Sequence, residues 1–180
     1  MEKLLKKYCA GNEELYQILL RHSRQVARRA LNIAITHADW TIDTGFLEEA
    51  ALLHDIGCVL VNAPTIHCLG TEPYIRHGLL GGEILRAEGL PLHARVAERH
   101  TGTGLTREAI ISQSLPLPLQ DFVPESLEER LICYADKFYS KTHLEEEKTY
   151  PQALHSLEKF GKDGVVLFQQ WHDEFEPIVE

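Results

Sequence analysis

Apolar residues recur every three or four positions along most of this chain, which is the spacing of one face of an α-helix. The first such stretch begins after Asn12, a residue suited to cap a helix, and fades by residues 37–40. His22 lies on the apolar face of this predicted helix. A histidine in that position is often only a core residue with a hydrogen-bond partner, so its role depends on the rest of the pattern.

A second predicted helix begins at Asp43 and Thr44, which suit its N-terminus. His54 shares its apolar face, and Gly57 is the predicted C-cap. Two consecutive helical residues diverge by about 100°, so His54 and its neighbour Asp55 can reach one point only at a helix end. The sequence therefore predicts that the helix ends close to this pair.

Helical spacing continues in the rest of the chain, and the predicted helices cover residues 76–88, 91–100, 106–113, 124–138, 151–160 and 164–175. The segment 58–74 has no clear period and contains prolines, a glycine and threonines, so we interpret it as a loop or broken segment beside the functional site. With 180 residues and no persistent strand pattern, we expect an all-α, single-domain helical bundle spanning 1–180. Its motif-bearing core would cover about 15–140, with C-terminal helices in 141–180 packed on it.

The charge and composition of the chain limit the classes of partner that it can bind. A formal net charge of −9 and a pI near 5.6 argue against nonspecific binding to duplex nucleic acid. No run approaches the roughly 20 apolar residues of a membrane span, and the N-terminus lacks a signal-peptide pattern. The four cysteines lack CxxC spacing and fit reduced thiols. We therefore expect a cytoplasmic protein without a membrane partner.

The stretch AALLHDIG carries the chemistry on which the prediction of function depends. It places His54 and Asp55 side by side at the end of an apolar segment, where an unpaired carboxylate would be costly to bury without a cation. Further single histidines and one aspartate lie near the apolar stripes of other predicted helices: His22, His77, His100 and Asp136. Each alone has an ordinary structural explanation, but mixed histidine and carboxylate sets are typical of sites for divalent first-row metals.

This order of histidines and aspartates resembles the HD-domain superfamily of metal-dependent hydrolases. The resemblance covers about Leu20 to Phe138 and is closest in AALLHDIG, RHGLLGGEIL, VAERH and CYADKF. The chain looks most like small archaeal and bacterial HD proteins with the HDIG signature. HD-GYP proteins differ, because they carry a double histidine and a GYP motif, whereas this chain has His100-Thr101 and no GYP. That difference argues against cyclic-dinucleotide hydrolysis.

The resemblance implies a specific set of ligands. A first metal would be held by His22, His54, Asp55 and Asp136. Family members with extra histidines bind a second metal through them, and here those ligands would be His77 and His100, with Asp55 bridging. By the same resemblance His54 and Asp55 would be the catalytic pair. The expected cofactors are two divalent ions, either iron or manganese, or another first-row metal such as nickel, cobalt or zinc.

Two divalent ions and two aspartates would leave a positive pocket in an acidic protein, which favours a phosphate substrate. We therefore expect a metal-dependent phosphohydrolase, either a phosphomonoesterase or a phosphodiesterase, that acts on a nucleotide or related small phosphoester through a metal-activated water. A second copy of the chain, forming a homodimer, is the other partner considered. The basic side chains nearest the ligands in sequence are the candidate phosphate contacts, namely Lys137, Arg99, Arg76 and Arg24.

Two other functions remain open from sequence. A diiron oxygenase of the HD type would use a similar set of six ligands, so only its substrate and redox state would differ. A nucleotide-binding regulatory module should show gaps in the ligand set, and here all six positions are filled. His67 lies in the segment without a clear period and has no ligand position in the resembling pattern, so we interpret it as an exposed histidine.

Overall fold

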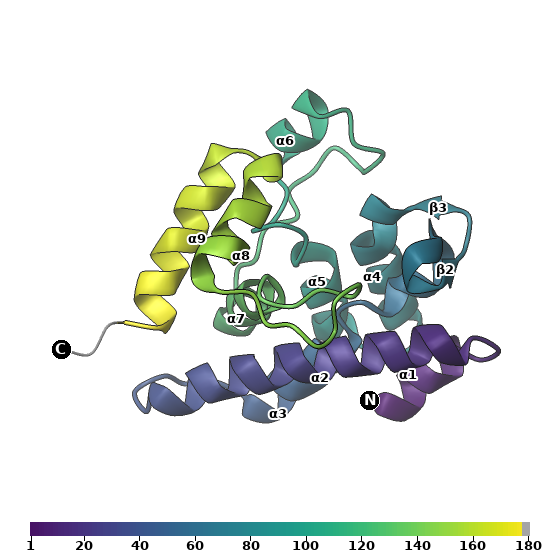
Figure 1. The fold of residues 1–180 in the computed structure, drawn as a ribbon, viewed down its shortest axis with the longest axis horizontal. Coiled ribbons are helices and arrows are strands. Elements are labelled where there is room, and N and C mark those ends of the chain that lie inside the picture. Colours follow the sequence, from purple (N-terminus) through teal and green to yellow (C-terminus); the bar gives the residue numbers. More distant parts are fainter. Residues whose placement is uncertain (178–180) are drawn as a thin grey trace.

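The computed structural model describes residues 1–177, apart from the side chain of Phe160. Within this range the chain forms nine α-helices and a small three-stranded sheet, so the all-α class is confirmed with a minor addition (Figure 1). The helices are α1 Glu2–Tyr8, α2 Glu13–Thr36, α3 Thr44–Leu53, α4 His77–Ala87, α5 Pro91–Arg99, α6 Arg107–Ser112, α7 Leu127–Asp136, α8 Tyr150–Leu157 and α9 Lys162–Phe175. The 3-10 turns are η1 Ile56–Leu60, η2 Pro64–Ile66, η3 Tyr74–Arg76 and η4 Glu158–Phe160, and the strands are β1 Val61–Ala63, β2 Cys68–Leu69 and β3 Glu72–Pro73.

Helix α2 is the long helix along the lower side of the molecule in Figure 1. It begins as predicted after Asn12, whose side chain accepts a hydrogen bond from the backbone N–H of Leu15 at 3.1 Å. Its buried residues recur at helical spacing and include Leu19, Val26 and Ala30. His22 lies on the same buried face, which directs its imidazole toward the interior of the bundle.

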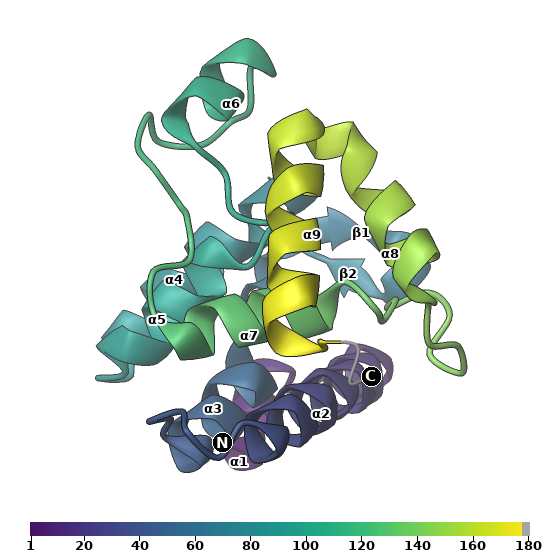
Figure 2. The ribbon, with the colours of Figure 1, turned by 90° about the vertical axis from the view of Figure 1, so that its left-hand side faces the viewer.

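One core cluster joins α2 and α3 to α7 and to the two C-terminal helices. Leu131 of α7 and Phe168, Trp171 and Phe175 of α9 are all buried in it. Figures 1 and 2 show α8 and α9 side by side, and α9 packs against α7. The C-terminal helices therefore share the core of the motif-bearing part. The last residues of the predicted domain, 178–180, lie outside the described residues.

A second core cluster surrounds the other end of α2 and contains residues of α1, α3, η1, α4 and α5. Leu5 of α1, Leu53 at the end of α3 and Leu85 of α4 are buried in it. Helix α6 stands away from these elements in both ribbon views. It packs instead on a small cluster of its own, formed by Leu105, Ile110 and Phe122.

The segment 58–74, which we interpreted as a loop or broken segment, contains the sheet. Its strand order is β2-β1-β3, with β1 antiparallel to β2 and parallel to β3. Strands of two or three residues are too short to show the alternation that identifies a strand in sequence. The sheet lies directly after the predicted ligand pair and beside α4 (Figure 1).

The predicted C-cap at Gly57 is wrong. Helix α3 ends at Leu53, His54 is its C-cap, and Gly57 lies inside the 3-10 turn η1. The glycine is required for a different reason, because a Cβ atom there would lie 2.0 Å from the carbonyl oxygen of His77 and 2.4 Å from the backbone nitrogen of Gly81. The absence of side chains at Gly57 and Gly81 lets α4 pack directly on the turn that follows α3.

The described residues form neither a membrane-spanning helix nor a disulfide. No helix in residues 1–177 is both long enough and apolar enough to cross a membrane. The cysteines Cys9, Cys58, Cys68 and Cys133 are buried and form no disulfide in the described structure.

Candidate metal centre

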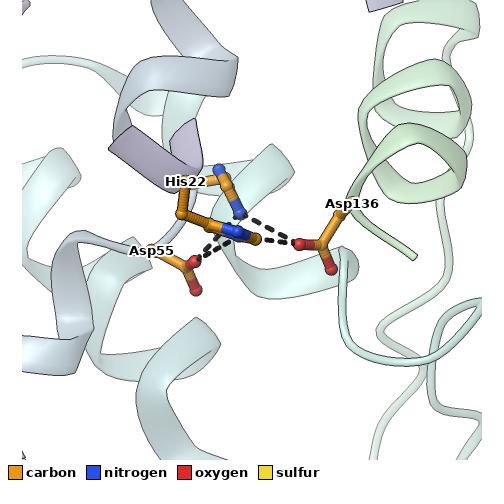
Figure 3. A group of neighbouring side chains, drawn as sticks. His22, Asp55 and Asp136 are labelled. Atoms are coloured by element: carbon orange, nitrogen blue, oxygen red, sulfur yellow. Dashed lines mark ion pairs between the residues drawn. The ribbon is translucent and has the colours of Figure 1, made fainter. Parts of the chain in front are cut away.

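Four of the predicted ligands meet between α2, the residues after α3 and the end of α7. His22 Nε2 lies 2.9 Å from Asp136 Oδ1 and 3.2 Å from Asp55 Oδ2 (Figure 3). His54 Nε2 lies 3.0 Å from the same oxygen of Asp55. One ligand atom from each of the four buried residues falls within 4.8 Å of the others, so this group can hold a metal ion.

The other two predicted ligands form a second group with Asp55. His77 is the first residue of α4 and His100 follows the last residue of α5. Their Nε2 atoms lie 3.5 Å and 3.4 Å from Asp55 Oδ1, and 3.0 Å from each other. Asp55 thus presents Oδ2 to the first group and Oδ1 to the second, which is the geometry needed for a bridging carboxylate.

Backbone geometry explains how neighbours in sequence reach the same site. His54 still has helical dihedral angles, with φ −55° and ψ −29°, but Asp55 has φ −103° and ψ 9° and starts the turn η1. This change of direction turns both side chains toward the interior. The helix therefore ends at the ligand pair, as the adjacency predicted, although the boundary differs from the predicted one. The close approach of α4 to η1 then brings His77 to the same point.

Three of the histidines are oriented in the same way. The Nδ1–H groups of His54, His77 and His100 donate to the carbonyl oxygens of Ala51, Tyr74 and Ala97 at 2.7, 2.8 and 2.7 Å. In the neutral ring this hydrogen bond fixes the tautomer that leaves the Nε2 lone pair free, as in metal-binding histidines. Among the described residues, His22 Nδ1 has no such partner.

The second group consists of two neutral imidazoles. Burial, together with the neighbouring His100 and Lys141, lowers the pKa of His77 to about 3, and burial also lowers the pKa of His100. Because both Nδ1–H groups are used by backbone carbonyls, two Nε2 lone pairs face each other at 3.0 Å near pH 7. Two facing lone pairs repel each other, and a cation bound by both removes that repulsion.

The first group is more strongly charged. Burial disfavours the His54 cation, but the carboxylates of Asp55 and Asp136 outweigh burial and raise the pKa of His54 to about 9. Burial alone would raise the pKa of Asp55, yet His54 and Lys141 hold that pKa well below its usual range. The carboxylates of this group therefore remain ionised at neutral pH, and His54 is protonated in the metal-free protein, so a metal ion bound here would displace the proton of His54.

Unpaired buried atoms test whether the site fits a metal. Within the described chain, His22 Nε2, His54 Nε2 and Asp55 Oδ2 are buried and make no hydrogen bond of acceptable geometry, although Asp55 Oδ2 forms an ion pair with Lys141. Leaving polar atoms unpaired in the interior is costly, and all three are directed at the same point. Imidazole nitrogen and carboxylate oxygen are suitable donors for divalent first-row metals. The residues present therefore fit the expected kind of ion.

Lys141 is a residue of the site that the sequence did not reveal. It lies in the loop after α7, its side chain is 11% exposed, and its Nζ atom is 2.6 Å from Asp55 Oδ2. Lys137, which was predicted, donates to Asp136 Oδ2 at 2.6 Å and to the His100 carbonyl at 2.9 Å. Lys141 belongs to no periodic pattern, so only the path of the loop places it beside the centre.

A cavity of about 460 Å³ opens above the two groups. His77, His100 and Asp136 lie at its floor, and Lys137 and Lys141 line it. The other predicted phosphate contacts do not reach it, because their guanidinium groups are paired elsewhere in the described structure: Arg24 with Glu2, Arg76 with Glu72, and Arg99 with Glu125 and Glu129. His67 is exposed, and its carbonyl oxygen accepts from Asn12.

Similar proteins were found by sequence and by structure. A tRNA (cytidine(56)-2'-O)-methyltransferase of Picrophilus torridus is 30% identical over 169 residues, which are 93% of this chain and 44% of that protein. An uncharacterized protein of Methanocaldococcus jannaschii is 34% identical over 136 residues, which are 74% of this chain and 69% of that protein. The chain thus spans less than half of the methyltransferase, so the name of that whole protein does not transfer to it.

Among solved structures, the HD domain of the phosphodiesterase PgpH of L. monocytogenes superposes with a TM-score of 0.57. The likeness covers 97% of this chain and 87% of that one, at 19% sequence identity, and at this identity it shows the fold alone. The sequence model of the HD domain matches residues 19–140, which include all six predicted ligands and most of the helices that position them. The chain is therefore a member of the HD domain family.

Proposed function

We propose that this protein is a metal-dependent phosphohydrolase that acts on a nucleotide or a related small phosphoester. The observation that carries the proposal is the position of Asp55, whose two oxygens face two separate metal-binding groups at the floor of a lysine-lined cavity. Membership of the HD domain family supports it, and so does the name of the structural neighbour PgpH, a phosphodiesterase.

Residues at the floor of the cavity would bind the metal ions, and lysines of its wall would bind the phosphate. His22, His54, Asp55 and Asp136 would hold one ion, and His77 and His100 would hold a second ion with Asp55. Bound there, the ions would supply Lewis acidity and lower the pKa of a water molecule, which makes hydroxide available at neutral pH. Lys137 and Lys141 lie where their ammonium groups can contact the oxygens of a phosphate above the floor.

Phosphate release from a panel of nucleotides tests the proposal. The protein is stripped with a chelator, reloaded with manganese and assayed with oxygen excluded, because hydrolysis needs no electron transfer. We expect turnover that depends on added metal. A substrate that is consumed only in the presence of oxygen, with an inactive manganese form, would instead establish an oxygenase. Tight nucleotide binding without turnover for any metal would establish a regulatory module.

A further inference from the structure

Lysines are concentrated in the lining of the cavity above the metal centre. Four of the eight lysines in the sequence line this cavity, namely Lys137, Lys141, Lys148 and Lys159. Among the described residues that line the cavity, Asp136 is the only acidic one. This concentration of positive charge contrasts with the net charge of −9 of the whole chain. A local charge of this sign attracts anions to the cavity and repels cationic ligands.

The lysines differ in how their charge is balanced. Lys137 and Lys141 each lie 2.6 Å from a carboxylate of the metal centre, Asp136 and Asp55 respectively. Lys148 is bound differently, because its Nζ atom donates to the backbone carbonyl of Lys137 at 3.3 Å and has no carboxylate within ion-pair distance in residues 1–177. Its charge is therefore available to a ligand.

Lys148 is also held in place by the fold. Its backbone N–H donates to the carbonyl oxygen of Phe138 at 2.8 Å, which ties this part of the loop to the end of α7. Its side chain is half-buried, and burial together with the ammonium groups of Lys137, Lys159 and Lys141 lowers its pKa, although the carboxylate of Asp136 acts in the opposite direction. Crowding of like charges costs free energy, and a bound anion would relieve it.

The volume of the cavity limits what can bind. About 460 Å³ lies within the usual range of roughly 300–1,000 Å³ for small-molecule sites, so the cavity is large enough for a nucleotide. Hydroxyl groups of Thr101, Ser140 and Thr142 add hydrogen-bonding partners to the wall. The polar and positively charged lining of the cavity therefore continues beyond the position where a single phosphate would contact the metal centre.

We propose that the cavity binds a substrate with two phosphate groups, the reacting one at the metal centre beside Lys141 and a second one at Lys148. This inference rests on the proposed function and adds a substrate class to it. A nucleoside monophosphate would fill the inner position alone. A nucleoside diphosphate or a 3',5'-bisphosphate would fill both positions and neutralise the charge of Lys148 as well.

The test compares AMP, ADP and adenosine 3',5'-bisphosphate with the manganese-loaded protein. We expect kcat/KM for at least one two-phosphate compound to exceed that for AMP by about tenfold to a hundredfold, the usual range for a charge-assisted hydrogen bond. Lys148→Ala should reduce this ratio by at least about tenfold, and Lys148→Arg should restore most of it. Lys162→Ala removes an exposed lysine outside the cavity and should leave the ratio unchanged.

A binding measurement without turnover gives a second readout. Calorimetric titration of the manganese-loaded protein with methylenediphosphonate, which is not hydrolysed, and with phosphate should show tighter binding of methylenediphosphonate, and Lys148→Ala should reduce that difference. Equal kcat/KM for AMP and both two-phosphate compounds, or an equal effect of Lys148→Ala on all three, would overturn the inference while leaving the phosphohydrolase intact. A protein that releases phosphate from none of the nucleotides in the wider panel, with any metal, would fail the proposed function itself.

Discussion

Asp55 is the residue on which both candidate metal-binding groups depend, because each of its oxygens faces a different group. Asp55→Asn keeps the shape of the side chain but removes its negative charge. We expect this variant to lose metal from both groups and to lose activity by at least about a hundredfold. Elemental analysis and phosphate-release assays measure the two effects. Asp163→Asn, at an exposed position of α9, is the control and should retain both metal and activity.

Lys141 should compete with metal for Asp55. Its ammonium group lies 2.6 Å from the Oδ2 atom that the first ion would need, so the two cations repel each other or exclude each other there. We expect Lys141→Met to bind manganese more tightly than the wild type, as measured by competition with a fluorescent chelator, and at the same time to raise KM for phosphate substrates. Weaker metal binding in this variant would show that Lys141 supports the site instead.

At the residue scale the sequence predicted the positions that the structure brings together, because each ligand lies on or next to the apolar stripe of a helix and so points inward. It failed for residues that reach the cavity from a loop. Lys141 has no periodic pattern around it, whereas Arg99 and Arg76 are adjacent to ligands in sequence but pair with nearby carboxylates. Proximity in sequence to a ligand was therefore a poor guide to the phosphate contacts. Whether the six positions hold metal stays a prediction.

At the scale of elements, the contact of α4 with η1 positions His77, and Gly57 makes that contact possible. Gly57→Ala would force a Cβ atom against two backbone atoms that cannot rotate away. We expect a loss of more than about 2 kcal/mol in the free energy of unfolding, with reduced metal binding, measured by urea denaturation and metal titration. Gly45→Ala, at an exposed position of α3, should change stability by less than about 1 kcal/mol.

The boundaries of the helices and strands show which structural elements could be predicted from the sequence and which could not. Helix starts were predicted well where a side chain caps them, as Asn12, Asp43 and Thr106 do, whereas the start of α7 was placed three residues too early. The end of α3 was misplaced because Gly57 resembles a C-cap in sequence, while its actual role depends on a helix that comes later in the chain. Helix α1 was not predicted, and the strands of the sheet depend on pairing between residues that have no local signal of their own.

At the scale of the whole molecule, the lowered pKa of a buried carboxyl predicts how the stability of the metal-free protein changes in acid. Burial alone would raise the pKa of Asp136, but Lys137, His22 and His54 hold it well below its usual range. The free carboxyl has a pKa of about 3.9, so its contribution to stability is present above that value and is lost as pH falls toward the folded-state pKa. Urea unfolding between pH 7 and 3 should therefore show a smaller loss of stability for Asp136→Asn than for the wild type. Equal slopes would contradict this.

The single-domain organisation that we predicted also has a direct test. The HD model ends at residue 140, yet Phe168, Trp171 and Phe175 of α9 are buried in the same cluster as α2 and α7. A protein shortened to residues 1–140 would expose that cluster and lose Lys141 and Lys148. We expect it to be unfolded or aggregated, whereas the full chain should unfold in one cooperative transition by circular dichroism and calorimetry. A stable, folded 1–140 protein would show that the C-terminal helices form a separate unit.

The ligands are spread from residue 22 to residue 136, and each comes from a helix, or the end of one, that also walls a hydrophobic core. The two ions that these residues would bind would therefore act as cross-links between distant parts of the chain. Because only the folded protein assembles the full set, the free energy of metal binding adds to that of folding, by about 2.7 kcal/mol when free metal is a hundred times its dissociation constant. A chelator would then act on this protein as a denaturant does, and metal supply would govern how much of it persists as well as how fast it works.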